Sequence, residues 1–323
     1  MRTVQEATAL GPSVVAIGAF DGVHIGHRQL ITMAVSSARA LGHTSAALTF
    51  FPHPLEVLQP QAALSRLTSP AEQERLLAGL GLDIMVRLPF AAVSGMAPPE
   101  FAKQVLVDGL RASTVCVGFN FRFGKGAVGN ARTLAALGQE QGFAVVVMEP
   151  VLLGGGVVSS TAVRKAIGQG NVGEAARLLG RPYSLEGTVG QGAGRGRTLG
   201  LPTANVVPDP GRAVPADGVY AVTVDWDGGP HAGVANLGRR PTFGGQGWSC
   251  EVHCLDFSGD LYGKRVSVCF LGRLRGERKF ADPAALQRQV SQDIVAARRH
   301  FARQGQHWTT ATECGTISSD ADA

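Results

Sequence analysis

The sequence predicts an α/β protein with two domains: an open, doubly wound parallel sheet followed by a small antiparallel β-barrel. The chain has 323 residues, whereas a single domain usually has about 100–200. Its first 150 residues alternate short apolar runs with helical stretches, which is typical of a parallel sheet covered by helices. From Tyr183 onward, short strand-like runs are separated by glycine and proline, which favours an antiparallel barrel.

The composition indicates folded cores and limits the classes of ligand. Hydrophobic residues make up 45% of the chain and charged residues 17%, which excludes wholesale disorder. The 30 Lys and Arg residues exceed the 25 Asp and Glu residues by five, and neither half of the chain forms a basic platform. We therefore expect small anionic ligands such as nucleotides, and no nucleic acid.

The sequence shows no targeting segment and no membrane span. The N-terminal residues lack the basic region and long apolar run of a signal peptide, and no window holds 18 uninterrupted apolar residues. The five cysteines are odd in number and irregularly spaced: Cys116, Cys250, Cys254, Cys269 and Cys314. If Cys250 and Cys254 share a strand, their sulfurs lie about 13 Å apart, too far to share a zinc ion. A reduced cytoplasmic protein without membrane contact is therefore expected.

The first domain is predicted from two sets of segments. Short apolar or β-branched runs predict buried parallel strands at Val14–Ile17, Ser45–Phe50, Ile84–Leu88, Thr114–Val117 and Phe143–Met148. Helical stretches fall at His27–Leu41, Ser69–Leu80, Pro99–Leu110 and Ala131–Gln141. Ser69, Pro70 and Glu72 form an N-terminal capping pattern. In such a sheet, the ligand binds beyond the carboxyl ends of the strands.

The pattern changes after residue 158. Two short helices are predicted at Ser159–Gly168 and Val172–Leu179, and a last helix at Pro283–Arg303. Strands are predicted at Leu185–Val189, Val219–Val224, Gly233–Ala235, Ser249–Leu255 and Arg265–Phe270. Gly180, Arg181 and Pro182 end the second helix, so we place the boundary there, with domains at 1–181 and 182–303. Residues 304–323 are predicted to be a disordered polar tail.

The sharpest local signal follows the first strand. Two histidines flank a glycine where a strand gives way to a helix, in the segment Gly18-Ala19-Phe20-Asp21-Gly22-Val23-His24-Ile25-Gly26-His27. Free backbone N–H groups and the positive end of a helix bind phosphate, and glycine lets the backbone approach it. Imidazoles there can stabilise charge that gathers on a phosphate during nucleotidyl transfer. The alternative is two ordinary histidines at a helix start.

This segment resembles the HxGH nucleotidyltransferase superfamily, whose domain is Rossmann-like. Three further segments narrow the resemblance to the adenylyltransferase half of bacterial bifunctional riboflavin kinase/FAD synthetases: Phe51-Pro52-His53-Pro54, Val117–Gly124 and Val158–Arg164. Taken alone, these would be a proline-rich turn, a strand end with packed aromatics and a helix N-cap. The resemblance covers residues 1–180, with Ala19 where many relatives carry Asn and Asn120 where many carry Asp.

The resemblance implies a role for each matching residue of the first domain. His24 and His27 would be catalytic. The nucleotide would be bound by Gly18, Phe20, Asp21, Gly22, His24, His27, Ser159, Ser160, Thr161 and Arg164. The flavin would be bound by Pro52, His53, Pro54 and Asn120.

A glycine-rich segment opens the second domain. Gly187–Asn205 holds no Walker A motif, but a glycine loop followed by Pro202-Thr203-Ala204-Asn205 can wrap phosphates, with Thr203 and Asn205 offering oxygens to Mg²⁺. The alternative is a glycine-rich surface hairpin. The segment resembles the riboflavin kinase loop with its PTAN signature. That resemblance implies nucleotide binding by Gly192, Gly194, Gly196, Arg197, Thr203 and Asn205.

Glu251 is the candidate general base of the second domain. A carboxylate next to apolar Val252 in a strand is not typical of a residue that merely faces solvent. A kinase that acts on a primary alcohol needs a base near the attacking hydroxyl. The resemblance to the kinase places the 5′-hydroxyl of riboflavin there, and the alternative is an exposed edge-strand glutamate. Arg275 and Glu277 are interpreted as flavin-positioning or structural residues.

Together these resemblances imply a bifunctional flavin enzyme. The barrel would phosphorylate riboflavin with ATP to FMN, and the first domain would transfer AMP from ATP to FMN, giving FAD and pyrophosphate, with Mg²⁺ in both steps. Self-association is an expectation from the family. A paralogue with one activity or an altered nucleotide or flavin preference remains an alternative, as does a non-catalytic flavin- or nucleotide-binding regulator. A pure binder would need neither the histidine pair nor Glu251.

Overall fold

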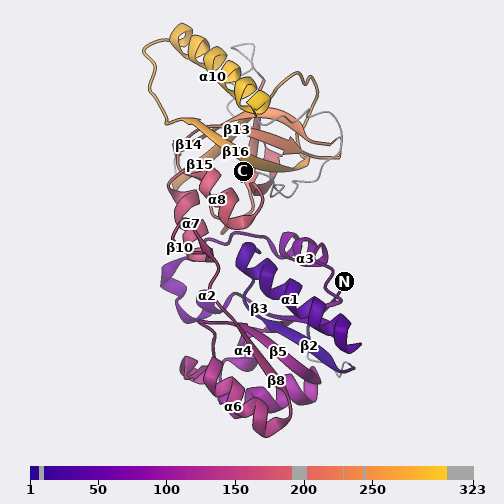
Figure 1. The fold of residues 1–323 in the computed structure, drawn as a ribbon. Helices are drawn as coiled ribbons and strands as arrows, with labels where there is room; N and C mark the ends of the chain where they lie inside the picture. The colour runs from indigo at the N-terminus through magenta and orange to yellow at the C-terminus, as the bar shows by residue number, and fades with distance from the viewer. Residues whose placement is uncertain (7–10, 191–201, 228, 243–244, 304–323) are drawn as a thin grey trace. The chain divides into compact units, whose positions relative to one another are not determined.

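The computed structural model of the chain describes residues 1–6, 11–190, 202–227, 229–242 and 245–303. The described chain divides into two compact units, Met1–Ser160 and Thr161–Ala323, and each unit is described by itself (Figure 1).

The first unit is built on a six-stranded sheet in which every neighbouring pair is parallel. Its order is β1 (Arg2–Val4), β4 (Ile84–Pro89), β3 (Thr44–Phe51), β2 (Ser13–Ile17), β5 (Ala112–Gly118) and β8 (Ala144–Met148). All five predicted strands are present, and β1 is an addition. Every residue of β2 is buried, because the strand lies inside the sheet with helices over both faces.

Helices cover both faces of this sheet, which confirms the predicted α/β class. On one face lie α1 (Ile25–Leu41) and α3 (Pro70–Ala78), with Leu30, Ile31 and Leu77 in the core. On the other lie α5 (Pro98–Phe101), a π-helical segment η2 (Ala102–Gly109), and α6 (Ala131–Gln141). The remaining elements are short: α2 (Pro54–Leu58), η1 (Pro60–Ala62), α4 (Phe90–Val93), β6 (Arg122–Phe123), η3 (Lys125–Ala127), β7 (Gly129–Asn130), β9 (Leu152–Leu153) and β10 (Gly156–Val157).

The strand order changes direction at β2. From β2 the chain continues to β3 and β4 on one side, and it later returns to β5 and β8 on the other. In an open parallel sheet, such a switch point leaves a crevice at the carboxyl ends of the strands. The segment from Gly18 to His27 leaves β2 at that end, so the topology directs it into the crevice.

The second unit is a closed barrel of six antiparallel strands, as the sequence predicts. Its order is β11 (Tyr183–Gly190), β12 (Ala204–Pro208), β15 (Gly245–Cys254), β14 (His231–Thr242), β13 (Gly218–Asp225) and β16 (Arg265–Arg275), which pairs with β11. Alternate side chains fill the barrel, and those that are almost fully buried include Tyr183, Leu185, Val206, Tyr220, Val222, Val252 and Phe270. The sequence did not reveal β12, which is short and ends at a proline.

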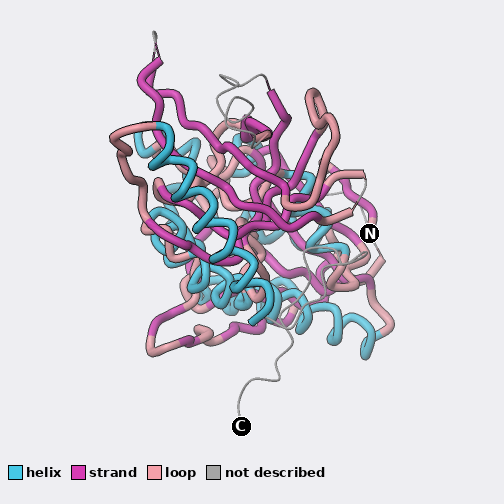
Figure 2. The backbone as a smooth tube through the Cα atoms, turned by 90° about the horizontal axis from the view of Figure 1, so that it is seen from above, coloured by secondary structure: helices cyan, strands magenta, loops and turns pink. Residues whose placement is uncertain are grey.

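A long helix, α10 (Pro283–Arg303), covers part of the outer barrel surface (cyan in Figure 2). Its Ala297 and Phe301 pack against Val219, Ala221 and Val234 of β13 and β14. The helix bounds match the predicted ones. The tail 304–323 lies outside the described residues.

Two helices before the barrel, α7 (Ser160–Gly168) and α8 (Val172–Leu179), also contact it. Helix α8 packs on β11 and β16, and its Leu178 and Leu179 are buried. Between the helices, the carbonyl of Gln169 accepts a hydrogen bond of 3.4 Å from Arg273 of β16. The contacts thus group both helices, apart from Ser160, with the barrel, whereas the sequence suggests a boundary at 181/182. Which fragment folds on its own stays a prediction.

We expect a fragment of residues 161–323 to be more stable than one of residues 181–323. Removing α7 and α8 would expose barrel surface and abolish the burial of Leu178 and Leu179, which is worth about 3–6 kcal/mol. The melting temperature of the shorter fragment should be roughly 10–20 °C lower by circular dichroism. A fragment of residues 172–323, which keeps α8, is the control and should be intermediate. Equal melting temperatures would show that the two helices do not support the barrel.

Candidate functional sites

His24 begins helix α1 and holds His27 in place. His24 is the N-cap, with extended backbone (φ −67°, ψ 170°), and its Nδ1 accepts a hydrogen bond of 3.2 Å from the backbone N–H of His27. Because Nδ1 is the acceptor, the proton of the neutral ring lies on Nε2. The capping bond thus selects the tautomer that can donate from the opposite side of the ring.

The two imidazoles are stacked. Their ring centroids are 3.6 Å apart with an interplanar angle of 15°, and Phe20 meets His27 edge-on at 5.3 Å. Burial, and then the neighbouring His24 and His53 rings, lower the pKa of His27 well below its usual 6.5. Its Nδ1 is buried without a hydrogen-bond partner among the described residues. His27 is therefore neutral near pH 7, with an unmet polar atom of the kind that a ligand can satisfy.

The loop before His24 is held in an unusual conformation. Phe20 and Val23 have φ angles of 51° and 41°, in the left-handed region that non-glycine residues avoid. The buried Asp21 carboxylate accepts hydrogen bonds from the backbone N–H groups of Leu67 and Thr68, at 2.9 and 3.1 Å. The Ser160 hydroxyl donates to the backbone carbonyl of Asp21 at 2.9 Å. The structure thus uses Asp21 and Ser160 to hold the loop, and their contact with a nucleotide stays a prediction.

Gly18 in the loop and Gly26 in the first turn of α1 leave room for aromatic rings. A Cβ on Gly26 would lie 3.3 Å from atoms of the His24 imidazole. A Cβ on Gly18 would lie 3.0 Å from the ring of Phe20. Both contacts are tighter than a side chain normally makes, so a larger residue at either position would push against the neighbouring ring.

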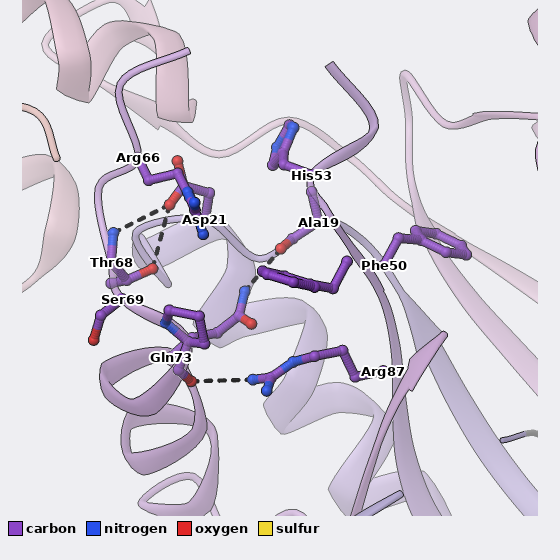
Figure 3. A pocket seen from close by; sticks show the side chains of 11 residues that line it. Ala19, Asp21, Phe50, His53, Arg66, Thr68, Ser69, Gln73 and Arg87 are labelled. Carbon is purple, nitrogen blue, oxygen red and sulfur yellow. Dashed lines mark hydrogen bonds between the residues drawn. The ribbon is translucent and has the colours of Figure 1, made fainter. Parts of the chain in front are cut away.

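A small hollow lies beside this loop, between the ends of β3 and β4 and the start of α3 (Figure 3). His53 caps α2, and its Nδ1 accepts a hydrogen bond of 3.1 Å from Leu55 N–H. In Figure 3, Asp21, His53 and Arg66 surround one end of the hollow.

The other end of the hollow is lined by Gln73 and Arg87 (Figure 3). Gln73 donates to the carbonyl of Ala19 at 2.9 Å, and Arg87 to that of Pro70 at 3.0 Å. Burial lowers the pKa of Arg87, although the nearby Glu74 acts in the opposite direction. These two side chains brace the loop after β2 and the start of α3.

The remaining predicted residues of this half lie in several places. Pro52 and Pro54 flank His53 at the end of β3. Asn120 is exposed in the turn after β5, beside β2 in the sheet. Ser159 directly precedes α7, whereas Thr161 and Arg164 lie within α7, in the second unit.

Glu251 lies in a row of polar side chains on the outside of the barrel. Its neighbours Cys250 and Val252 are buried in the interior, so Glu251 of β15 points outward. It is directly opposite Asn205 of β12 on one side and Asn236 of β14 on the other. Directly opposite residues have Cβ atoms about 5 Å apart, so the carboxylate lies between two amides. The exposed edge-strand alternative is wrong, because β15 has a neighbour on both sides.

Arg275 belongs to the same row, but its side chain binds helix α10. It pairs with Val219, which is itself opposite Asn236. Its guanidinium forms two hydrogen bonds with the Asp293 carboxylate of α10, at 2.9 and 2.8 Å. Glu277 is exposed, and its Oε1 lies 2.9 Å from where a Cβ on Gly238 would be. The structure thus shows Arg275 fastening α10, while flavin contacts of Arg275 and Glu277 stay predictions.

Part of the glycine-rich segment lies outside the described residues, namely Gly192, Gly194, Gly196 and Arg197. Thr203 and Asn205 are described, and both are partly buried. Among the described residues, no group of three or more His, Cys, Asp or Glu side chains could hold a metal ion. Cys116, Cys250, Cys254 and Cys269 are buried thiols, and burial raises the pKa of Cys250 to about 12.

The fold and the two sites define a two-domain nucleotide-dependent transferase. The family model described as FAD synthetase matches residues 6–162, and the model described as riboflavin kinase matches residues 179–301. The bifunctional riboflavin kinase/FMN adenylyltransferase of Pseudomonas fluorescens is 42% identical over 88% of this chain and 92% of its own length. The protein of that name from Escherichia coli K12 is 39% identical over 89% of this chain and 92% of its own length. The chain belongs to the bifunctional riboflavin kinase/FMN adenylyltransferase family.

A solved structure described as a macrolide-efflux protein from Streptococcus pneumoniae is also similar. Its TM-score is 0.84 and its identity 33%, over 92% of this chain and 98% of that one. Within the part of the chain that the structure describes, no helix is both long and apolar enough to cross a membrane.

Three residues beside the sites were not identified as site residues from the sequence: Arg87, Asn236 and His253. From the sequence, Arg87 cannot be distinguished from an ordinary charged residue within an apolar strand. Asn236 lies 15 positions before Glu251, and only the strand register places it against that residue. His253 has a signal in its spacing, because alternation puts residues 251 and 253 on the same side of a strand.

We expect His27 to stay neutral below pH 6.5 in the ligand-free protein, and its pKa to rise in His53→Asn. The Asn side chain can still cap α2, but it removes one of the neighbouring rings that disfavour a charged His27. Burial is the larger cause, so the pKa should still remain below 6.5. Histidine NMR titration measures both values, with His43→Asn as a control.

The same shift fixes the sign of a stability effect. Because the pKa of folded His27 is lowered, the unfolded chain binds more protons, and stability falls as the pH drops through about 6.5. A His27 signal that titrates at or above 6.5 in the wild type would contradict the neutral buried ring.

Proposed function

We propose that this chain uses ATP to convert riboflavin to FMN in the barrel, and FMN to FAD in the parallel-sheet unit. Membership of the family supports both activities. The observation that carries the proposal is the presence of one suitable site in each unit. One unit has a stacked histidine pair at a helix start, with a neutral His27, and the other has an outward carboxylate between two amides.

In the parallel-sheet unit, a phosphate oxygen of FMN attacks the α-phosphorus of ATP and pyrophosphate leaves. The protein forms no covalent bond in this displacement and acts by position and electrostatics. His24 carries its proton on Nε2 and can donate it in a hydrogen bond to a phosphate oxygen. His27 and the N–H groups at the start of α1 stabilise the charge that develops there. The strained loop held by Asp21 positions all of these groups beforehand.

In the barrel, Glu251 acts as general base toward the 5′-hydroxyl of riboflavin. The carboxylate takes the proton as the hydroxyl oxygen attacks the γ-phosphorus of ATP, and ADP leaves. Asn205 and Asn236, on the two sides of Glu251, have amides that can orient the carboxylate or the substrate.

Mg²⁺ fits the donor set near Glu251. Thr203 and Asn205 offer a hydroxyl and an amide oxygen, which are hard ligands that suit this ion, and Mg²⁺ usually keeps several waters and phosphate oxygens beside few protein ligands. When bound, Mg²⁺ neutralises charge on the triphosphate. We propose that Thr203 and Asn205 hold it.

Replacing His27 with Ala should abolish FAD formation while FMN still accumulates from riboflavin. Loss of one preorganised transition-state donor costs about 2.7–4 kcal/mol, or a hundred- to a thousandfold in rate. Chromatography of FMN and FAD after incubation of riboflavin with ATP measures both steps. His43→Ala, at the opposite end of the sheet, is the matched control and should leave both rates intact. Unchanged adenylyl transfer in His27→Ala would move the chemistry to other residues.

Replacing Glu251 with Gln should lower the kinase kcat by roughly a hundred- to ten-thousandfold, because an amide keeps the size but cannot take a proton at neutral pH. Riboflavin and ATP binding, measured by calorimetry, should persist. Conversion of supplied FMN to FAD is the internal control.

Three results would count against this role of Glu251. Lost binding would make Glu251 a positioning residue rather than the base. A kcat near that of the wild type would remove the base assignment altogether. If a melting curve showed an intact fold while both activities were lost, the proposal of separate sites would be wrong.

A further inference from the structure

The ladder between β12 and β15 ends one residue short of Thr203. Its pairs are Val206 with Cys250, Asn205 with Glu251, and Ala204 with Val252. The next pair in the same register would be Thr203 with His253. Thr203 would therefore be opposite His253 just as Asn205 is opposite Glu251, with all four side chains on the outer side of the barrel.

Beyond the last backbone pair of this ladder, the side chain of His253 makes the next contact. Its Nδ1 lies 2.9 Å from the carbonyl oxygen of Pro202, the residue before Thr203. A carbonyl only accepts hydrogen bonds, so Nδ1 carries the proton and donates it. Thr203 is thus held on both sides, by the Pro202–His253 bond before it and by the Ala204–Val252 pair after it.

We propose that His253 is a positioning residue of the kinase site, which sets Thr203 beside Asn205 so that both oxygens meet the same metal–nucleotide. This inference rests on the proposed kinase function. The bond to Pro202 links the strand that carries the base to the segment that carries the metal ligands. Base and phosphate-binding groups are then kept in one register through a single side chain.

The position of the bond indicates which quantity it affects. The His253–Pro202 bond is exposed, and His253 lies outside the apolar barrel interior, so its loss should change global stability little. Thr203 would instead lose one of its two restraints. The expected effect is weaker Mg²⁺-dependent nucleotide binding, with a higher KM for ATP and a smaller change in kcat.

Three substitutions in the full-length chain separate the donor from the ring. His253→Ala removes the donor. His253→Asn places an amide N–H close to where Nδ1 lies, whereas His253→Gln places it near the position of Nε2. Asn should therefore restore the bond to Pro202, and Gln, although it has the same chemistry, should not.

The experiment measures ADP binding by calorimetry with and without Mg²⁺, together with kinase KM and kcat and a melting curve. A net hydrogen bond of ordinary strength predicts a two- to tenfold (roughly) weaker Mg²⁺-dependent affinity in His253→Ala and His253→Gln. His253→Asn should stay close to the wild type, and Mg²⁺-free binding should be equal in all four proteins.

Each other outcome overturns the inference in a recognisable way. A wild-type protein without Mg²⁺-dependent ADP binding and without kinase turnover would overturn the proposed kinase function as well. A normal wild type with unchanged His253→Ala would overturn the role of His253 alone. An equal loss in all three variants, including His253→Asn, would show that the bond to Pro202 is not what His253 supplies.

Discussion

The arrangement of the parallel-sheet site depends on the buried carboxylate of Asp21. It accepts hydrogen bonds from the segment before α3 and so holds a loop in which Phe20 and Val23 have left-handed backbone angles. Such angles cost about 1–3 kcal/mol each for non-glycine residues, so they persist only where other contacts enforce them. With the loop in this shape, His24 caps α1 and stacks on His27. Removing the carboxylate would release the strain and the ring stack together.

The barrel site depends on strand register rather than on a strained loop. Glu251, Asn205 and Asn236 come from three strands, and a shift of one residue in β15 would turn Glu251 into the interior. The apolar residues that alternate with it, Cys250 and Val252, prevent this shift because they fill the barrel. The packing of the core therefore sets the position of the carboxylate that we propose as the general base.

The sequence predicts the fold class and nearly all the long elements, because their periodicity is strong. Helices α6, α8 and α10 have the predicted bounds. Strand β12 was missed because its five residues, which end at Pro208, carry no clear alternation. The histidine pair could be located from its motif, but its stacking and the neutral state of His27 depend on burial by residues distant in the chain.

For other residues, the structure adds contacts that no local pattern contains. Asp21 reads as a possible ligand in the motif, yet its carboxylate is hydrogen-bonded to residues 46 and 47 positions away. Arg275 is interpreted from the sequence as a flavin-positioning or structural residue, and the structure shows that it pairs with Asp293 of α10. In both cases a charged side chain near a motif has a partner that only the tertiary fold supplies.

The neutral state of His27 has a consequence for the energetics of nucleotide binding. An anion beside the ring favours the imidazolium form, so a triphosphate bound there, as we propose, would raise the lowered pKa of His27. Binding would then take up a fraction of a proton from the buffer. The heat measured on binding would include the ionisation enthalpy of that buffer, and the affinity would strengthen as the solution becomes more acidic. The protonation of one buried ring would thereby link nucleotide occupancy to the acidity of the medium.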